Sequence, residues 1–191
     1  ALLAGGGGGL TNWTDAVSTA SPNATVPVVS LTATNGATNV DAVLSPKGTG
    51  SIAAHVADGT ATGGGKRGTR AVDWQTQRGS SGQVASGNNS VIAGGQNNQA
   101  SGNFSVVGGG AGNSATTTNA TIAGGISCQA TSTYATVGGG NTNIASGAYS
   151  AIGGGNTNTS SANFSYVGGG RNKTAGRQNS GIVGGFQATT R

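Results

Sequence analysis

Residues 90–95 read Ser-Val-Ile-Ala-Gly-Gly, and variants of this segment return with a strict 15-residue period. The six further copies begin at residues 105, 120, 135, 150, 165 and 180. Each copy starts with Ser or Ala, carries Ile or Val two places later, and runs into glycines. A fixed period of this kind indicates a repeat architecture, in which equivalent positions of successive units stack on one another.

The columns of the repeat separate inward-facing from outward-facing positions. The Ser or Ala and the Ile or Val two places later share one face of a short strand, because side chains alternate along a strand. Five places before the Ser or Ala, every copy has Ala except the one with Ser160. The sequence therefore predicts an all-β fold, a parallel β-solenoid with one coil and two short strands per repeat. Its predicted core is the column Ile92, Val107, Ile122, Val137, Ile152, Val167 and Ile182.

A column of polar residues lies seven places before the Ser or Ala. Four of its members are asparagines, at positions 98, 113, 143 and 158. Stacked Asn amides can form hydrogen-bonded ladders, so we expect one here. Cys128 and Lys173 occupy the same column. Cys128 is expected to be a buried, inert thiol, with a cross-link between chains as the alternative. Lys173 argues against an inward-facing ladder at the C-terminal end.

The predicted core is thin, which points to association between copies of the chain. Each coil would bury one Ile or Val, one Ala and one Ser or Ala. This is too little apolar surface to offset the loss of conformational entropy when a whole coil becomes ordered. A homotrimer would supply the missing burial, since cyclic assemblies bury the same patch on every copy. The predicted trimer contacts are the aromatic side chains of an outward column: Phe104, Tyr134, Tyr149 and Phe164.

Composition excludes several classes of protein. The 191 residues include 39 Gly, four Asp, one His, one Cys and no Glu, so few side chains are available for acid–base chemistry or metal binding. We therefore expect no enzyme activity, no cofactor and no metal. The net charge is +5, but residues 79–170 carry no charge, so the basic stripe typical of nucleic-acid binding is missing. No apolar run is long enough to predict a membrane span. Disorder is the competing interpretation of so much Gly, Ser and Asn, and the unbroken register argues against it.

Three regions are expected along the chain. Residues 1–24 predict an N-terminal arm that orders on a partner, with one short helical turn near residues 13–20. Residues 25–82 predict a β-rich attachment region, and residues 83–191 the solenoid.

The attachment region is rich in strand and turn signals. The Val- and Thr-rich residues 25–34 predict a strand. Residues 46–49, Pro-Lys-Gly-Thr, predict a hairpin turn between segments 39–45 and 50–57. Residues 59–70 predict a loop and residues 70–77 a strand carrying Trp74. Asp73 is expected to form a local ion pair of little energetic value with Arg70 or Arg78.

The repeats resemble the heads of trimeric autotransporter adhesins. The resemblance rests on residues 90–95, on Ala-Ser-Gly at 100–102 and on Ser-Val-Val-Gly at 105–108. It implies a left-handed parallel β-roll built by three chains side by side. Two features depart from the family pattern: the doubled or tripled glycines, and a repeat one position longer than that family often shows.

Nearly the whole chain is also similar to the tail fibre proteins of tailed bacteriophages. The similarity rests on residues 25–34, 39–52 and 70–78, followed by the glycine-rich repeats. It implies a trimeric fibre, located in the virion and therefore extracellular, whose residues 1–82 join a tail or baseplate protein. The distal part of such a fibre contacts a receptor on the host cell. Thr190 falls in the Ala column, so the pattern stops within a coil, and we expect this chain to be the N-terminal part of a longer protein.

Two alternative functions remain open at this point. A bacterial trimeric surface adhesin head would use the same repeats. An ice-binding β-solenoid would need a regular Thr-x-Thr column, and only the coils with residues 116–118 and 131–133 approach one.

Overall fold

The computed structural model describes residues 13–18, 28–33, 49–185 and 189–190. The chain divides into two units, Ala1–Leu44 and Ser45–Arg191. In the first unit, β1 (Trp13–Ser18) pairs in antiparallel with β2 (Val28–Ala33). β2 lies within the strand predicted for residues 25–34. β1 lies within the short helical turn predicted near residues 13–20, and that prediction of a helical turn is wrong for residues 13–18.

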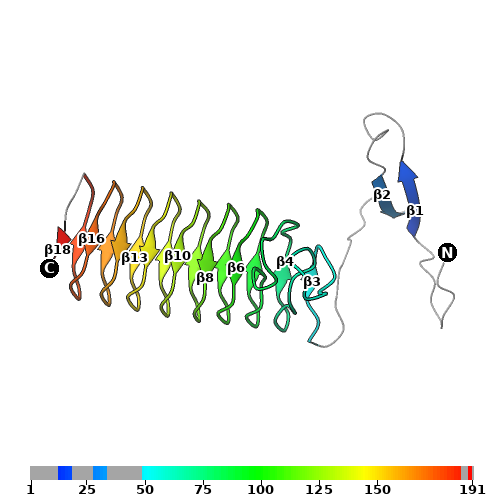
Figure 1. The fold of residues 1–191 in the computed structure, drawn as a ribbon, viewed down its shortest axis with the longest axis horizontal. Helices are drawn as coiled ribbons and strands as arrows, with labels where there is room; N and C mark the ends of the chain where they lie inside the picture. The colour runs from blue at the N-terminus through cyan, green and yellow to red at the C-terminus, as the bar shows by residue number, and fades with distance from the viewer. Residues whose placement is uncertain (1–12, 19–27, 34–48, 186–188, 191) are drawn as a thin grey trace. The chain divides into compact units, whose positions relative to one another are not determined.

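The second unit is a parallel β-solenoid of about eight turns (Figure 1). One sheet has nine strands: β3 (Ile52–Ala53), β4 (Val72–Asp73), β5 (Val91–Ile92), β7 (Val106–Val107), β9 (Thr121–Ile122), β11 (Thr136–Val137), β13 (Ala151–Ile152), β15 (Tyr166–Val167) and β17 (Gly181–Ile182). The other has seven: β6 (Gln99–Ala100), β8 (Ser114–Ala115), β10 (Gln129–Ala130), β12 (Ile144–Ala145), β14 (Thr159–Ser160), β16 (Thr174–Ala175) and β18 (Thr189–Thr190). The expected two short strands per repeat are confirmed.

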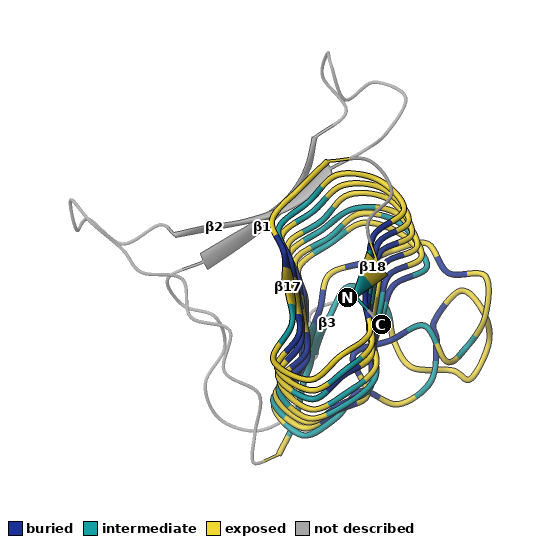
Figure 2. Cartoon of the chain, turned by 90° about the vertical axis from the view of Figure 1, so that its left-hand side faces the viewer, coloured by how far each residue is buried: buried dark blue, intermediate teal, exposed yellow. Residues whose placement is uncertain are grey.

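Successive coils are joined so that each residue pairs with its equivalent in the next repeat. Val137 pairs with Ile152, for example, and Ala130 pairs with Ala145. A third line of parallel bridges, which the sequence did not predict, links residues 77, 96, 111, 126, 141, 156 and 171. Figure 2 looks along the stack and shows the two sheets on opposite sides of each coil. Each coil is thus held to the next along three lines.

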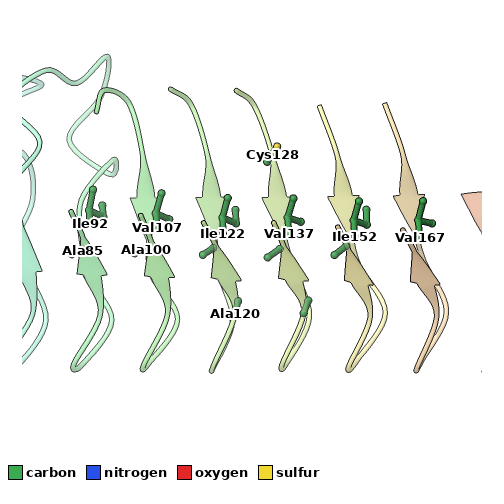
Figure 3. Close-up of a cluster of buried hydrophobic side chains, with 14 of the residues drawn as sticks. Ala85, Ile92, Ala100, Val107, Ala120, Ile122, Cys128, Val137, Ile152 and Val167 are labelled. Carbon is green, nitrogen blue, oxygen red and sulfur yellow. The ribbon is translucent and has the colours of Figure 1, made fainter. Parts of the chain in front are cut away.

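The apolar interior consists of two facing columns of small side chains between the two sheets. The predicted core column, Ile92 to Ile182, is buried, with exposed fractions from 0% to 7%. The facing Ala column, from Ala85 to Ala175, is fully buried as well. Figure 3 shows Ile92, Val107, Ile122, Val137, Ile152 and Val167 pointing the same way in consecutive coils. Because each coil buries so little, stability depends heavily on the contacts between coils.

The stack begins before residue 83, where the sequence analysis placed its start. β3 and β4 continue the nine-stranded sheet, with Asp73 in register with Ile92. β3 pairs in parallel with β4, so the interpretation of residues 50–57 as one arm of a hairpin is wrong. Its other arm, residues 39–45, and most of the predicted turn lie outside the described residues. The strand predicted for residues 70–77 is limited to Val72–Asp73.

The asparagine column forms an inward ladder whose partners are backbone groups. The Asn113 side chain donates from Nδ2 to Gly109 O at 2.8 Å and to Gly125 O at 2.9 Å. Its Oδ1 accepts the backbone N–H of Cys128 at 2.9 Å. Asn98, Asn143 and Asn158 make the equivalent contacts. The expected ladder exists, but its amides bridge coils through main-chain groups, which satisfies every buried polar atom of these side chains.

Lys173 and Cys128 both lie inside this ladder. Lys173 is 1% exposed and its backbone N–H donates to Asn158 Oδ1, so the ladder does reach the C-terminal coils. Cys128 is fully buried, which leaves its thiol inaccessible to a second chain. The Cys128 Sγ lies 3.6–3.7 Å from three carbonyl oxygens, but a single S–H can donate to only one of them.

Replacing Cys128 by asparagine is expected to stabilise the protein by about 1–3 kcal/mol. The new amide would donate to the carbonyls of Gly124 and Gly140 and accept the N–H of Asn143, as its neighbours in the column do in their own coils. Urea unfolding of Cys128→Asn and of the parent chain would measure the change in midpoint. Cys128→Ser is the matched control, because it removes the thiol without supplying the amide. An unchanged or lower midpoint for Cys128→Asn would contradict the assigned role of the column.

Candidate interaction surface

The aromatic column lies at the turn that leads into the nine-stranded sheet. Each aromatic residue precedes the buried Ser or Ala of its coil, and its backbone N–H is bonded to the coil before it. The N–H of Tyr149 donates to Thr133 O at 3.0 Å, and the N–H of Phe164 donates to Ala148 O at 2.9 Å. Phe104 and Tyr134 make the same bond to Asn88 and Thr118. These bonds between coils fix the backbone conformation of the column.

That conformation is left-handed in every coil. The φ angles are 57°, 59°, 57° and 56° at Phe104, Tyr134, Tyr149 and Phe164. The other three positions of the column are Asn89, Asn119 and Asn179, with φ of 54–59°. Asparagine tolerates this region, whereas a bulky side chain there is strained by about 1–2 kcal/mol.

The four aromatic side chains are half exposed, and three of them stack. Their exposed fractions are 46–55%. The ring centroids of Tyr134 and Tyr149 are 4.7 Å apart, and those of Tyr149 and Phe164 are 5.0 Å apart, with interplanar angles of 12° and 7°. Phe104 is separated from this group by the coil that carries Asn119.

Stacking within one chain does not offset the cost of the column. A stacked aromatic pair contributes roughly 0.5–1.5 kcal/mol beyond its burial, and the column has two such pairs. The conformational strain of four aromatic residues in the left-handed region exceeds the stabilisation that two stacked pairs supply. Residues at the other turn, among them Ser127, Thr142 and Thr157, adopt the same left-handed backbone, with φ of 54–55°. The aromatic column differs from them in placing large, half-exposed apolar side chains there, which makes it the leading candidate for a site of interaction.

The surroundings of the column are uncharged. Residues 79–170 contain no Asp, Glu, Lys or Arg, so the positive net charge resides elsewhere. Tyr166, two residues after Phe164, is 46% exposed on the outward side of the nine-stranded sheet. Val91 and Val106 occupy the same outward column and are partly buried. The outward column of the adjoining sheet is thus uncharged and partly apolar, with Thr121 and Thr136 between its apolar residues.

A buried ionic cluster closes the interior near β4. Asp73 occupies the Ile or Val column and has no exposed surface. Its Oδ2 accepts from Arg67 Nε at 3.0 Å and from Arg78 Nη2 at 3.1 Å. Arg67 also donates to Gly63 O and Gly65 O, and Arg78 donates to Thr62 O, Gln75 O and Gln83 O. The expected ion pair of Asp73 with Arg78 is present. The expectation that it has little energetic value was wrong, because the pair is buried, includes Arg67 as a second partner and holds two polypeptide loops onto the first coils.

The loop before this cluster contains an Asx turn. Asp58 Oδ1 accepts from Thr60 Oγ1 at 2.7 Å and from Thr60 N at 2.9 Å. These bonds hold the pKa of the exposed Asp58 carboxyl below its usual value. Among the described residues, His, Cys, Asp and Glu do not gather in groups of three that could hold a metal ion. None of the described segments is a helix long and apolar enough to cross a membrane.

Two parts of this site were not predicted from the sequence. The outward orientation of the aromatic column follows from its place in the repeat, but its left-handed backbone does not. The three asparagines in the same column carried that signal, because Asn is enriched in this region. The Asp73 cluster left no signal, since Asp73 and its register partner Ile92 are further apart than one repeat and the period is interrupted there.

Comparisons with protein-family models, with curated proteins and with solved structures find no match to this chain.

Proposed function

We propose that this chain is a structural protein of a bacteriophage virion, the proximal part of a tail fibre. In this proposal three copies form a stiff rod and a distal part contacts the host receptor. Residues 1–82, which include the first strands of the stack, join the rod to a tail or baseplate protein. The mechanism is mechanical, since the rod transmits position and force and binds no substrate or cofactor.

The unbroken stacking of coils supports the proposal most directly. Three lines of parallel backbone contacts run through the solenoid, and each asparagine of the ladder ties its coil to the next. Such a stack resists bending because every coil is held at several points around its perimeter. The uncharged surface over residues 79–170 suits a spacer that must not bind ions, nucleic acid or other proteins along its length.

Immunoelectron microscopy would test the location. Antibodies raised against the full chain are expected to label the tail fibres of the virions whose genome encodes it. Preimmune serum is the control. Label on a bacterial cell surface, with none on virions, would overturn the proposal in favour of a surface adhesin.

Sedimentation of the full chain would test the assembly separately. We expect three times the mass of one chain, together with the high frictional ratio of a rod. A folded monomer at micromolar concentration would overturn the trimeric part of the proposal.

A further inference from the structure

We propose that the aromatic column is the surface on which copies of this chain contact one another, parallel and in coil-for-coil register. The inference rests on the proposed homotrimer and deepens it, since it names the contact surface and its alignment. The aromatic column here means Phe104, Tyr134, Tyr149 and Phe164.

The backbone conformation and the exposure of these side chains together favour a partner outside their own chain. All four occupy a left-handed conformation, and three coils fill the same position with asparagine, which fits that conformation and is soluble when exposed. A chain that used this surface only to face water would gain stability and solubility from asparagine throughout. Aromatic side chains in the column stabilise the protein more than asparagine would when another molecule buries their exposed halves.

The stacking shows what kind of molecule fits. Tyr149 has a ring on each side, so both of its faces are covered. A sugar that binds by stacking on a ring face finds little free face between Tyr134 and Phe164. The ring edges remain open and form a ridge with one ring per coil. A partner that contacts the whole ridge would present apolar groups at the same spacing, as a second copy of this chain does.

The gap at Asn119 sets the direction and the register. Two parallel copies in register bring every ring opposite its equivalent and place Asn119 opposite Asn119. An antiparallel arrangement centred on Tyr134 would instead set Asn119 against Tyr149 twice. A shift by one coil would leave only two ring-to-ring contacts. The in-register parallel arrangement alone matches all four rings.

Charge does not oppose this packing. Like charges brought close together would cost energy, but residues 79–170 carry none. The net charge of +5 comes from the segments before and after this stretch.

Replacing all four rings by asparagine tests the contact in the full chain. The variant combines Phe104→Asn, Tyr134→Asn, Tyr149→Asn and Phe164→Asn, and each substitution copies a residue that the column already uses. We expect circular dichroism to show a folded chain and sedimentation to show a monomer where the parent is a trimer. The single variant Tyr149→Asn is expected to raise the dissociation constant of the assembly at least about tenfold.

Ile126→Asn is the matched control. Ile126 is 53% exposed in the line of bridges at the other turn, and its column carries asparagine at positions 141 and 156. We expect this variant to keep the parent mass and dissociation constant. If the four-ring variant fails to fold, the single variant decides, and an unchanged dissociation constant overturns the proposal.

Disulfide formation tests the register. Chains with Tyr149→Cys and chains with Phe104→Cys are assembled together and oxidised, with the native Cys128 buried and out of reach. Disulfides that join like positions are expected. Disulfides between positions 104 and 149 would overturn the register, and the absence of any disulfide would overturn the contact. If the parent chain is a trimer but the disulfide results are negative, the proposed fibre stands and only the proposed contact surface is overturned. If the parent chain is a monomer, both the trimeric fibre and the contact surface are overturned.

Discussion

Gly155→Ala is expected to destabilise the protein by about 3 kcal/mol, whereas Gly154→Ala leaves stability unchanged or raises it slightly. The two glycines are neighbours in one turn, yet they differ in conformation and in free space. Gly155 has a φ of 96°, and a Cβ there would overlap the carbonyl oxygen of Gly170 and lie 2.7 Å from Asn158 Nδ2. The φ of Gly154 lies outside the left-handed region, and nothing lies within 4 Å of a Cβ built on it.

The physical reason is the spacing of the coils. The obstruction at Gly155 comes from the backbone of the next coil and from the ladder amide that binds Gly170 O. Neither group can rotate away as the tip of a long side chain could, so the coils would have to separate locally. Urea unfolding of both variants beside the parent chain would measure the difference in midpoint. Equal midpoints for the two variants would show that the spacing of the coils is softer than the structure indicates.

Asp73→Ala is expected to destabilise the protein by about 3–5 kcal/mol. The side chains of Arg67 and Arg78, which contact Asp73 through their guanidinium groups, are 2% and 0% exposed. Removing the carboxylate leaves two positive charges in the interior with only carbonyl partners. Asp73 Oδ1 also accepts the N–H of Gln75, which would lose its acceptor.

Thermal unfolding in low and high salt would check this prediction. A pair this deeply buried is screened little, so the loss for Asp73→Ala should persist at high ionic strength. Asp58→Asn is the matched control, because Asp58 is an exposed carboxylate in the same loop region whose contacts are confined to its own turn. A loss no larger for Asp73→Ala than for Asp58→Asn would contradict the structural role of the cluster.

The solenoid was predictable from the sequence because the same 15-residue pattern occurs seven times. The Ile or Val column, the Ala column and the two strands of each coil all follow from one period and from alternation along a strand. The asparagine column was found in the same way. The hydrogen bonds from these asparagines to glycine carbonyls were not predicted. A column of identical amides does not reveal whether each amide bonds to another side chain or to the main chain.

The segments that break the period were predicted less well. β4 is separated from its partner β5, and β3 from β4, by more than one repeat length. The extra residues form the loops that Arg67 and Arg78 hold, so no fixed spacing marked residues 52–53 and 72–73 as part of the stack. β1 was missed because a short segment without a repeat carries a weak signal, and its pairing with β2 joins segments separated in the sequence.

The asparagine ladder has a consequence for how such a chain can change in length. Each amide contacts its own coil and the next one only, so the coils that carry asparagine meet equivalent surroundings in the ladder. A duplication or deletion of one whole repeat that carries this asparagine therefore restores the bonds of the ladder, and moves an end of the rod by one coil. A gain or loss of part of a repeat shifts the register, so that a residue other than asparagine faces the glycine carbonyls of the turn and the ladder bonds are lost there. Length is thus free to vary in whole coils, while the cross-section stays constant.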